Sequence, residues 1–285
     1  MPRRMKKAGD GPASASKVAV TGEAALFLEE GIARFGSGDV QGAITAWTRA
    51  VALDPTLAEA WFDLGTAYAD LSDLDQSARC YRSAVELQPD VHQSWYNLGF
   101  TCAGRGDLVA AAAAYRRATE LNAGDYETWY NLGNAYLDLG RFDEAVAAYK
   151  TALVQHDGDY DVWNNLGNAL VQLERVTEAD ECFRRALALN PAYDLSWNNL
   201  GNVLEELGAL VEAQAAYEKA VELVPDQATY RLNLASVLAR GSEDDRAILH
   251  LARALELAPE IRSLLPGFAE FQGLLVSPLL LTADD

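Results

Sequence analysis

Asparagine side chains return at a fixed interval of 34 residues along this chain. A carboxamide both donates and accepts hydrogen bonds, so a row of carboxamides can pair with the backbone of an extended peptide whatever the peptide's side chains. Five asparagines share one position of the interval, and three more lie three residues further along. The first set is Asn97, Asn131, Asn165, Asn199 and Asn233, and the second set is Asn134, Asn168 and Asn202.

The sequence shows no residue pattern typical of catalysis or of cofactor binding. His92, His156 and His250 fall at unrelated positions of the interval, and none has a Cys, Asp or Glu at a metal-ligand spacing. No glycine-rich phosphate-binding loop occurs. The three cysteines are odd in number and widely spaced, which favours buried thiols over a disulfide framework. We therefore expect a non-enzymatic protein without cofactor or metal.

The chain is strongly acidic, and its charge limits the kinds of partner. Its 285 residues carry a formal net charge of -19 at pH 7, with a pI near 4.5. Nucleic acids and anionic membrane surfaces repel such a charge, so we expect a basic or neutral protein or peptide as partner. The sequence has no secretory signal and no apolar run of about 18 residues. These features predict a cytoplasmic protein that does not insert into membranes.

The asparagines belong to a longer sequence motif that recurs along the chain. Residues 129–134 read WYNLGN, and both 163–168 and 197–202 read WNNLGN. A fixed period of about 20–50 residues indicates stacked supersecondary units. The frame runs without insertion over residues 24–261, which predicts seven units of equal length. Their predicted bounds are 24–57, 58–91, 92–125, 126–159, 160–193, 194–227 and 228–261.

Each unit is predicted to fold as two helices. Apolar residues in the first half follow the three- and four-residue spacing of a helical stripe, and a glycine then stands where a helix ends in a left-handed cap. A second helix follows, with an aromatic residue three positions before an alanine. The capping glycines are Gly38, Gly106, Gly140 and Gly208, and the aromatic residues are Trp47, Tyr81, Tyr115, Tyr149, Phe183 and Tyr217.

Two segments lie outside the repeats. Residues 1–22 combine several Lys and Arg with Gly, Pro and Ser and show no helical period, which predicts a disordered basic tail. In residues 262–285 an apolar stripe predicts a short helix that begins near Pro266 and covers the end of the seventh unit. The stripe consists of Leu264, Leu265, Phe268, Phe271, Leu274 and Leu275.

The recurring positions resemble the tetratricopeptide repeat (TPR), a helix-turn-helix unit of this length. In the fourth unit the matching residues are Trp129, Leu132, Gly133, Ala145 and Ala152 at positions 4, 7, 8, 20 and 27, and the other units repeat most of them. The resemblance implies an all-α, right-handed TPR superhelix (an α-solenoid) of seven repeats, with a C-terminal capping helix.

In TPR stacks the first helices of the repeats line a concave groove, and the resemblance places both asparagine sets there. They are similar to the Asn ladder in the TPR superhelix of O-linked N-acetylglucosamine transferases. Tyr96 and Tyr130 would then be packing anchors for a peptide, with carboxylates such as Asp63, Glu127 and Asp161 around it. In units two to six the groove positions hold no Lys or Arg. Asn is also typical of TPR sequences, where it is solvated or bonds between adjacent helices, so a role in peptide binding and a role as ordinary repeat chemistry both remain open.

The sequence favours one function and leaves two others. The favoured function is a non-enzymatic protein–protein interaction scaffold that binds an extended, basic or neutral segment in its groove. One alternative is a self-associating assembly protein, which would form homo-oligomers through its ends or its apolar C-terminal tail. The other is an accessory subunit of an enzyme such as a glycosyltransferase.

Overall fold

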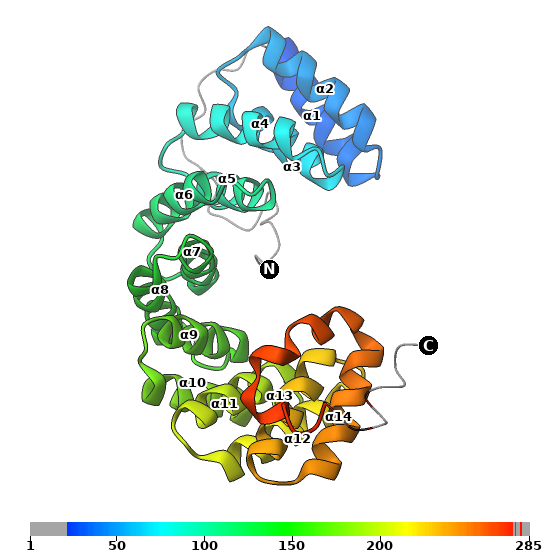
Figure 1. Cartoon of the computed structure of the whole chain (residues 1–285). Coiled ribbons are helices and arrows are strands. Elements are labelled where there is room, and N and C mark those ends of the chain that lie inside the picture. The colour runs from blue at the N-terminus through cyan, green and yellow to red at the C-terminus, as the bar shows by residue number, and fades with distance from the viewer. Residues whose placement is uncertain (1–21, 276, 278–279, 281–285) are drawn as a thin grey trace. The chain divides into compact units, whose positions relative to one another are not determined.

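The structure is a computed structural model that describes residues 22–275, 277 and 280. The tail predicted over residues 1–22 lies outside the described residues except for Gly22, and so does most of the chain beyond 275. The described residues contain fourteen α-helices in consecutive pairs and no β-strand, which confirms the predicted all-α repeat fold (Figure 1). The chain divides after Asp157 into two compact units, each of which is described by itself.

The first unit contains four helix pairs. Each odd-numbered helix packs against the next helix in the chain, and each of α2, α4 and α6 also packs against the odd-numbered helix that follows it. The odd-numbered helices therefore form one row and the even-numbered helices a second row (Figure 1). The helices are α1 (Gly22–Gly36), α2 (Val40–Leu53), α3 (Ala58–Asp70), α4 (Leu74–Leu87), α5 (His92–Gly104), α6 (Leu108–Leu121), α7 (Tyr126–Asp138) and α8 (Phe142–Gln155).

The second unit repeats this arrangement with three pairs. Contacts also join α9 to α11 and α11 to α13, so the odd-numbered helices again lie in a row. Three short 3-10 turns follow the last pair. The elements are α9 (Tyr160–Gln172), α10 (Val176–Leu189), α11 (Asp194–Glu206), α12 (Leu210–Leu223), α13 (Ala228–Arg240), α14 (Asp244–Leu257), η1 (Pro259–Ser263), η2 (Leu265–Gly267) and η3 (Ala269–Phe271).

In four of the described helix pairs, a glycine forms the turn between the two helices. Gly106 has a φ of 76° between α5 and α6, a conformation that costs glycine little and other residues more. Asp107 then caps α6, because its carboxylate accepts the Ala110 N–H at 3.2 Å. The other three predicted capping glycines also have positive φ, as expected for left-handed helix caps.

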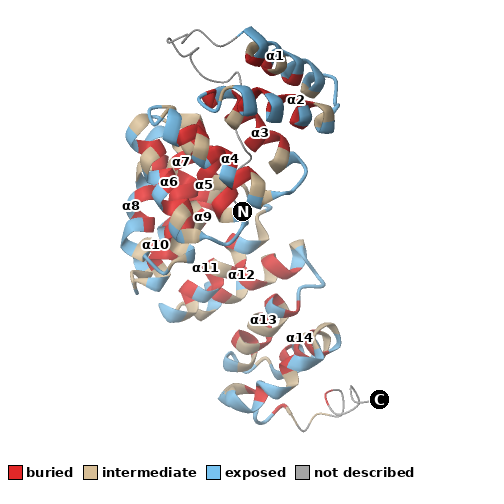
Figure 2. Ribbon diagram, turned by 90° about the horizontal axis from the view of Figure 1, so that it is seen from above, coloured by how far each residue is buried: buried red, intermediate tan, exposed pale blue. Residues whose placement is uncertain are grey.

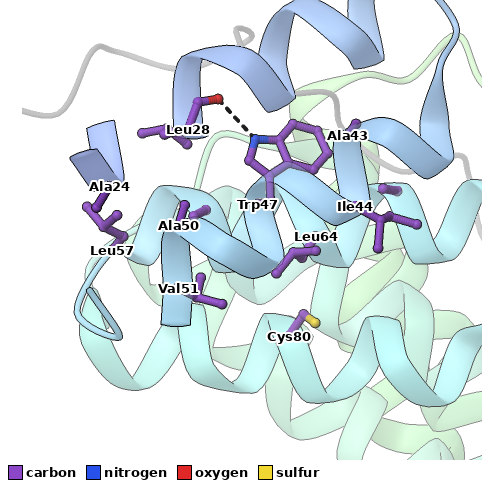
Figure 3. Packing of buried hydrophobic residues seen from close by; sticks show 12 residues of the cluster. Ala24, Leu28, Ala43, Ile44, Trp47, Ala50, Val51, Leu57, Leu64 and Cys80 are labelled. Carbon is purple, nitrogen blue, oxygen red and sulfur yellow. Dashed lines mark hydrogen bonds between the residues drawn. The ribbon is translucent and has the colours of Figure 1, made fainter. Parts of the chain in front are cut away.

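Within each pair the second helix places a large side chain against the first. Figure 3 shows this for Trp47, which is 2% exposed and donates its indole N–H to the Leu28 carbonyl at 3.2 Å. A Cβ added to Gly31 would lie 2.3 Å from the Trp47 ring, so only glycine admits this contact. Buried residues lie on the helix faces that meet in this way (Figure 2). Equivalent contacts join Gly65 to Tyr81, Gly99 to Tyr115, Gly133 to Tyr149, Gly167 to Phe183 and Gly201 to Tyr217.

The tryptophans at position 4 have a different role from these buried rings. Trp129 is only partly buried, and its indole N–H donates to the Ala123 carbonyl at 2.9 Å. Trp61, Trp95 and Trp197 make the same bond to the residue six positions earlier. Each of these tryptophans therefore ties the start of its repeat to the loop that enters it, while the rings of the second helices fill the core.

Gly133→Val is expected to lower the free energy of unfolding by about 1–3 kcal/mol. A Cβ at this position would lie 2.5 Å from the buried Tyr149 ring, so the added methyl groups must displace the ring or the helix. Urea unfolding followed by circular dichroism measures the change. Gly124→Ala is the control, because its Cβ would meet nothing closer than 3.6 Å; equal midpoints for the two variants would contradict this packing.

The C-terminal segment differs from the single helix predicted near Pro266. It forms the turns η1, η2 and η3, because proline and the glycines at 267 and 273 oppose a continuous α-helix. The segment still covers the seventh helix pair, since η1 packs on α14 and η3 on α13. Phe271 is fully buried, whereas Leu264, part of the predicted stripe, is 58% exposed.

Within the part of the chain that the structure describes, no helix is both long enough and apolar enough to cross a membrane.

Candidate functional site

The second compact unit of the structure, after Asp157, carries a continuous set of asparagines along its odd-numbered helices. Residues three apart on a helix share one face, so Asn165 and Asn168 lie together on α9, as do Asn199 and Asn202 on α11. Asn233 continues the set on α13. We call these residues, with Asn164 and Asn198 one position before, the amide ladder; its members are Asn164, Asn165, Asn168, Asn198, Asn199, Asn202 and Asn233.

Some of the side-chain groups of the amide ladder bond to a neighbouring helix. The Asn199 side-chain amide on α11 donates to Asn164 Oδ1 at 3.2 Å and to Asn168 Oδ1 at 3.0 Å, both on α9. Asn233 on α13 repeats the pattern toward α11, with bonds of 2.9 Å to Asn198 Oδ1 and 3.4 Å to Asn202 Oδ1. The bonds between adjacent helices that are typical of TPR asparagines are therefore present here.

Four groups of the ladder, on Asn168, Asn199, Asn202 and Asn233, have no partner among the described residues. The side-chain NH2 groups of Asn168 and Asn202 donate to no group among the described residues, and the Oδ1 atoms of Asn199 and Asn233 accept from none. Asn202 is exposed and the other three are partly exposed. Two donor groups and two acceptor atoms without a partner therefore lie along the odd-numbered helices α9, α11 and α13. The backbone of an extended chain offers both complements.

The first unit buries its share of the predicted site. Tyr96 and Asn97 are 0% exposed, Asn131 is 1% exposed and Tyr130 is 4% exposed. Asn131 donates to the Tyr96 hydroxyl at 3.0 Å, between α7 and α5. These four side chains lie inside the stack, so a bound segment cannot reach them in this arrangement. Asn134 is partly exposed, but its Oδ1 accepts the Tyr149 hydroxyl at 2.7 Å.

The difference between the two units comes from the residue at position 5 of the repeat. Phe62, Tyr96 and Tyr130 fill that position in three of the four repeats of the first unit, and the Tyr96 hydroxyl accepts a hydrogen bond from the buried Asn131. The second unit has Asn164 and Asn198 there, which are short and accept the ladder bonds. The residue type at position 5 is visible in the sequence. It could have separated the buried asparagines from the accessible ones.

The carboxylates of the odd-numbered helices have unequal surroundings. Glu127 on α7 and Asp161 on α9 are partly exposed. Glu205 is paired, because the Arg240 guanidinium lies 2.5 Å from it and the Tyr217 hydroxyl donates to it at 2.7 Å. Burial and the bond to Glu205 raise the pKa of Tyr217. Asp63 on α3 is only 6% exposed.

The free energy held in one ladder bond can be measured by a double-mutant cycle. We expect Asn199→Ala and Asn164→Ala to lose less stability together than the sum of the single variants, with a coupling of about 0.5–1.5 kcal/mol. Urea unfolding of the four proteins gives this value. Gln172→Ala replaces Asn164→Ala in a control cycle, because Gln172 is exposed on α9 and outside the ladder. Zero coupling between Asn199 and Asn164 would contradict the structural role.

Among the residues that the structure describes, no group of three or more His, Cys, Asp or Glu could hold a metal ion.

Comparisons with known proteins agree with this architecture. A family model described as the cilia and flagella-associated protein 70 C-terminal domain matches residues 4–223, and a tetratricopeptide repeat model matches residues 193–260. No protein with curated annotation matches the chain.

Several solved structures are similar to this chain, and one of them is described as a TPR protein. YrrB, described as a TPR protein with an unusual peptide-binding site, is 25% identical, with 67% of this chain and 98% of YrrB covered and a TM-score of 0.57. MamA is also 25% identical, with 59% and 92% covered and a TM-score of 0.57. PilF of Pseudomonas aeruginosa, 21% identical with 76% and 95% covered and a TM-score of 0.60, shows the fold alone. The chain is a tetratricopeptide repeat protein, and it belongs to the family of the cilia and flagella-associated protein 70 C-terminal domain.

Proposed function

We propose that this protein is a non-enzymatic scaffold whose amide ladder binds the backbone of an extended segment of another protein. TPR proteins are in general protein–protein interaction scaffolds, and the ladder supplies a specific means of binding. The observation that carries the proposal is the row of open groups on Asn168, Asn199, Asn202 and Asn233. Because the internal bonds already orient these amides, binding a segment would order few side chains.

The charge around the ladder favours a basic or neutral segment. Asp161 and Glu206 lie on the same helices as the ladder and have no cationic partner among the described residues. Arg240, which does lie on α13, is held by Glu205. An acidic segment would meet uncompensated carboxylates, whereas Lys or Arg side chains would be attracted to them.

The similarity to YrrB supports a peptide ligand, because YrrB is described as having a peptide-binding site. For this chain, the proposal goes beyond peptide binding in general. It assigns the hydrogen bonds to named atoms of four asparagines and leaves the buried Tyr96, Asn97, Tyr130 and Asn131 to the core.

Selection from a random 12-residue peptide display library against the whole chain tests the proposal. We expect the selected peptides to be enriched in Lys and Arg and to bind less tightly as salt rises, because the ladder lies among carboxylates. Selected peptides that are acidic, or that bind equally at low and high salt, would count against the predicted partner chemistry.

A pair of substitutions separates backbone recognition from simple charge attraction. Asn168→Asp with Asn202→Asp keeps the oxygen atoms that accept the internal bonds and removes the two open donors. It also makes the surface more negative, so attraction alone predicts tighter binding of a basic peptide. We expect binding to weaken by about tenfold or more instead. Gln172→Glu makes the same amide-to-carboxylate change outside the ladder on α9 and should not weaken binding.

A further inference from the structure

Asp63 stands apart from the five asparagines that hold the same position, the sixth, in the later repeats. Four of the asparagines there donate to a neighbouring helix, among them Asn97 to Tyr81, Asn131 to Tyr96 and Asn199 to Asn164. Asn233 does the same toward Asn198. Asp63, the counterpart on α3, is 6% exposed and has no hydrogen-bond or ion-pair partner among the described residues.

The first repeat explains why Asp63 finds no donor. Where later repeats have Tyr96 or Asn164, the first repeat has Leu28, which has no polar side-chain group. Where the second repeat has Tyr81, the first has Trp47, whose only donor already binds the Leu28 carbonyl at 3.2 Å (Figure 3). Both sites that satisfy the other members of the row are therefore closed to a carboxylate.

The charges that face Asp63 are negative or neutral. Glu59 lies one turn earlier on α3 and is exposed. Burial, together with the Glu59 carboxylate, raises the pKa of Asp63 to about 7, and no cation opposes the rise. The Asp63 charge acts on the Tyr81 hydroxyl of α4, which is neutral and bonds Thr66 and Asn97. On α2, the residue at the repeat position of Tyr81 is the neutral Trp47. On α1, Glu29 holds the repeat position of Asp63.

A nearly buried carboxylate without a donor is costly, and such a group calls for an explanation. We propose that Asp63, with the exposed Glu59 beside it, forms an anionic site for the guanidinium or ammonium group of a basic side chain of a partner protein. A guanidinium presents paired N–H donors that match a carboxylate, so arginine is the better fit. The site lies in the first compact unit, before residue 158, and does not include any residue of the amide ladder.

Titration of the whole chain with N-acetyl-arginine amide, followed by NMR at pH 8 and low salt, tests this site. N-acetyl-citrulline amide is the matched probe, because it keeps the shape and removes the charge. We expect the arginine probe alone to shift backbone signals of α3. The probe should bind about tenfold more tightly at pH 8 than at pH 6, since a carboxyl with a pKa near 7 is about one-tenth ionised at pH 6.

Two variants make the result specific. Asp63→Asn should weaken arginine binding by about tenfold or more, and Glu59→Gln, a change at an exposed residue, should weaken it less. Asp70→Asn is the control, because Asp70 is an exposed carboxylate on the same helix. Equal binding of citrulline, no binding of arginine, or full binding by Asp63→Asn would overturn the proposal.

Removal of residues 1–21 distinguishes the source of the cation. Those residues include Arg3 and Arg4, so they could compete for the site from within the same chain. If the arginine probe binds only after their removal, the site belongs to the chain's own tail and the proposal of a partner's side chain falls. Because the small probe needs no contact with the amide ladder, every outcome leaves the proposed function to its own test.

Discussion

Tyr149→Ala is expected to lower the free energy of unfolding by about 3–5 kcal/mol, the range found when a buried aromatic ring is removed from a core. Tyr149 is fully buried on α8, and its ring lies directly on the backbone of Gly133 on α7. Its hydroxyl donates to Asn134 Oδ1 at 2.7 Å. The substitution therefore removes the ring that joins the two helices of a repeat, and it also leaves the Asn134 amide oxygen without this donor.

Urea unfolding of a matched set of variants checks the expectation. Tyr149→Phe removes only the hydroxyl and should cost about 1 kcal/mol. Tyr115→Phe removes the equivalent hydroxyl on α6, which is buried without a partner among the described residues, so it should cost nothing or stabilise the protein. Val154→Ala on α8 is the surface control, since Val154 is 83% exposed. A loss for Tyr149→Ala no larger than that of the surface control would contradict the account of the core.

Asp63→Asn is expected to stabilise the protein by about 2–4 kcal/mol at pH 8. The pKa of this carboxyl rises from its usual 3.8 to about 7 on folding, chiefly through burial. Between these two values the unfolded chain has lost the proton that the folded chain still holds, so stability falls as pH rises from about 4 to about 7. The neutral amide removes this contribution.

Unfolding midpoints measured from pH 4 to pH 8 test the sign as well as the size. The variant should match the wild type near pH 4 and exceed it increasingly up to pH 7, above which the difference should stay constant. Asp70→Asn, on the same helix but exposed, should follow the wild type at every pH. Parallel curves for Asp63→Asn and the wild type would show that the carboxyl is not destabilised by folding.

The repeat period was sufficient to predict the helix pairs, because one helical stripe, one cap and one small-to-large contact return at each interval. Gly133 opposite Tyr149 is such a contact, and both residues hold fixed positions in the 34-residue repeat. The segment after residue 261 follows no repeat. There the apolar stripe suggested one helix, but Pro266 and Gly267 oppose the helical backbone, and η2 and η3 formed instead.

Accessibility of the candidate site was harder to predict, because it depends on pairs of residues about 35 positions apart. Asn131 and Asn199 occupy the same position of their repeats. The first is buried against Tyr96, whereas the second bonds the short Asn164 and stays partly exposed. The isolation of Asp63 likewise depends on Leu28 and on the direction of the Trp47 indole, which only the packed structure reveals.

The most direct test of the central proposal is a backbone scan of a peptide selected on this protein. Each peptide N–H is replaced in turn by an ester oxygen, and each side chain in turn by that of alanine, and the Kd is measured for the whole chain. If the open oxygens of Asn199 and Asn233 accept backbone donors, at least two esters should weaken binding by about tenfold, and alanine should matter mainly at basic residues. If every ester binds as well as the parent peptide, the amide ladder serves only to join its helices.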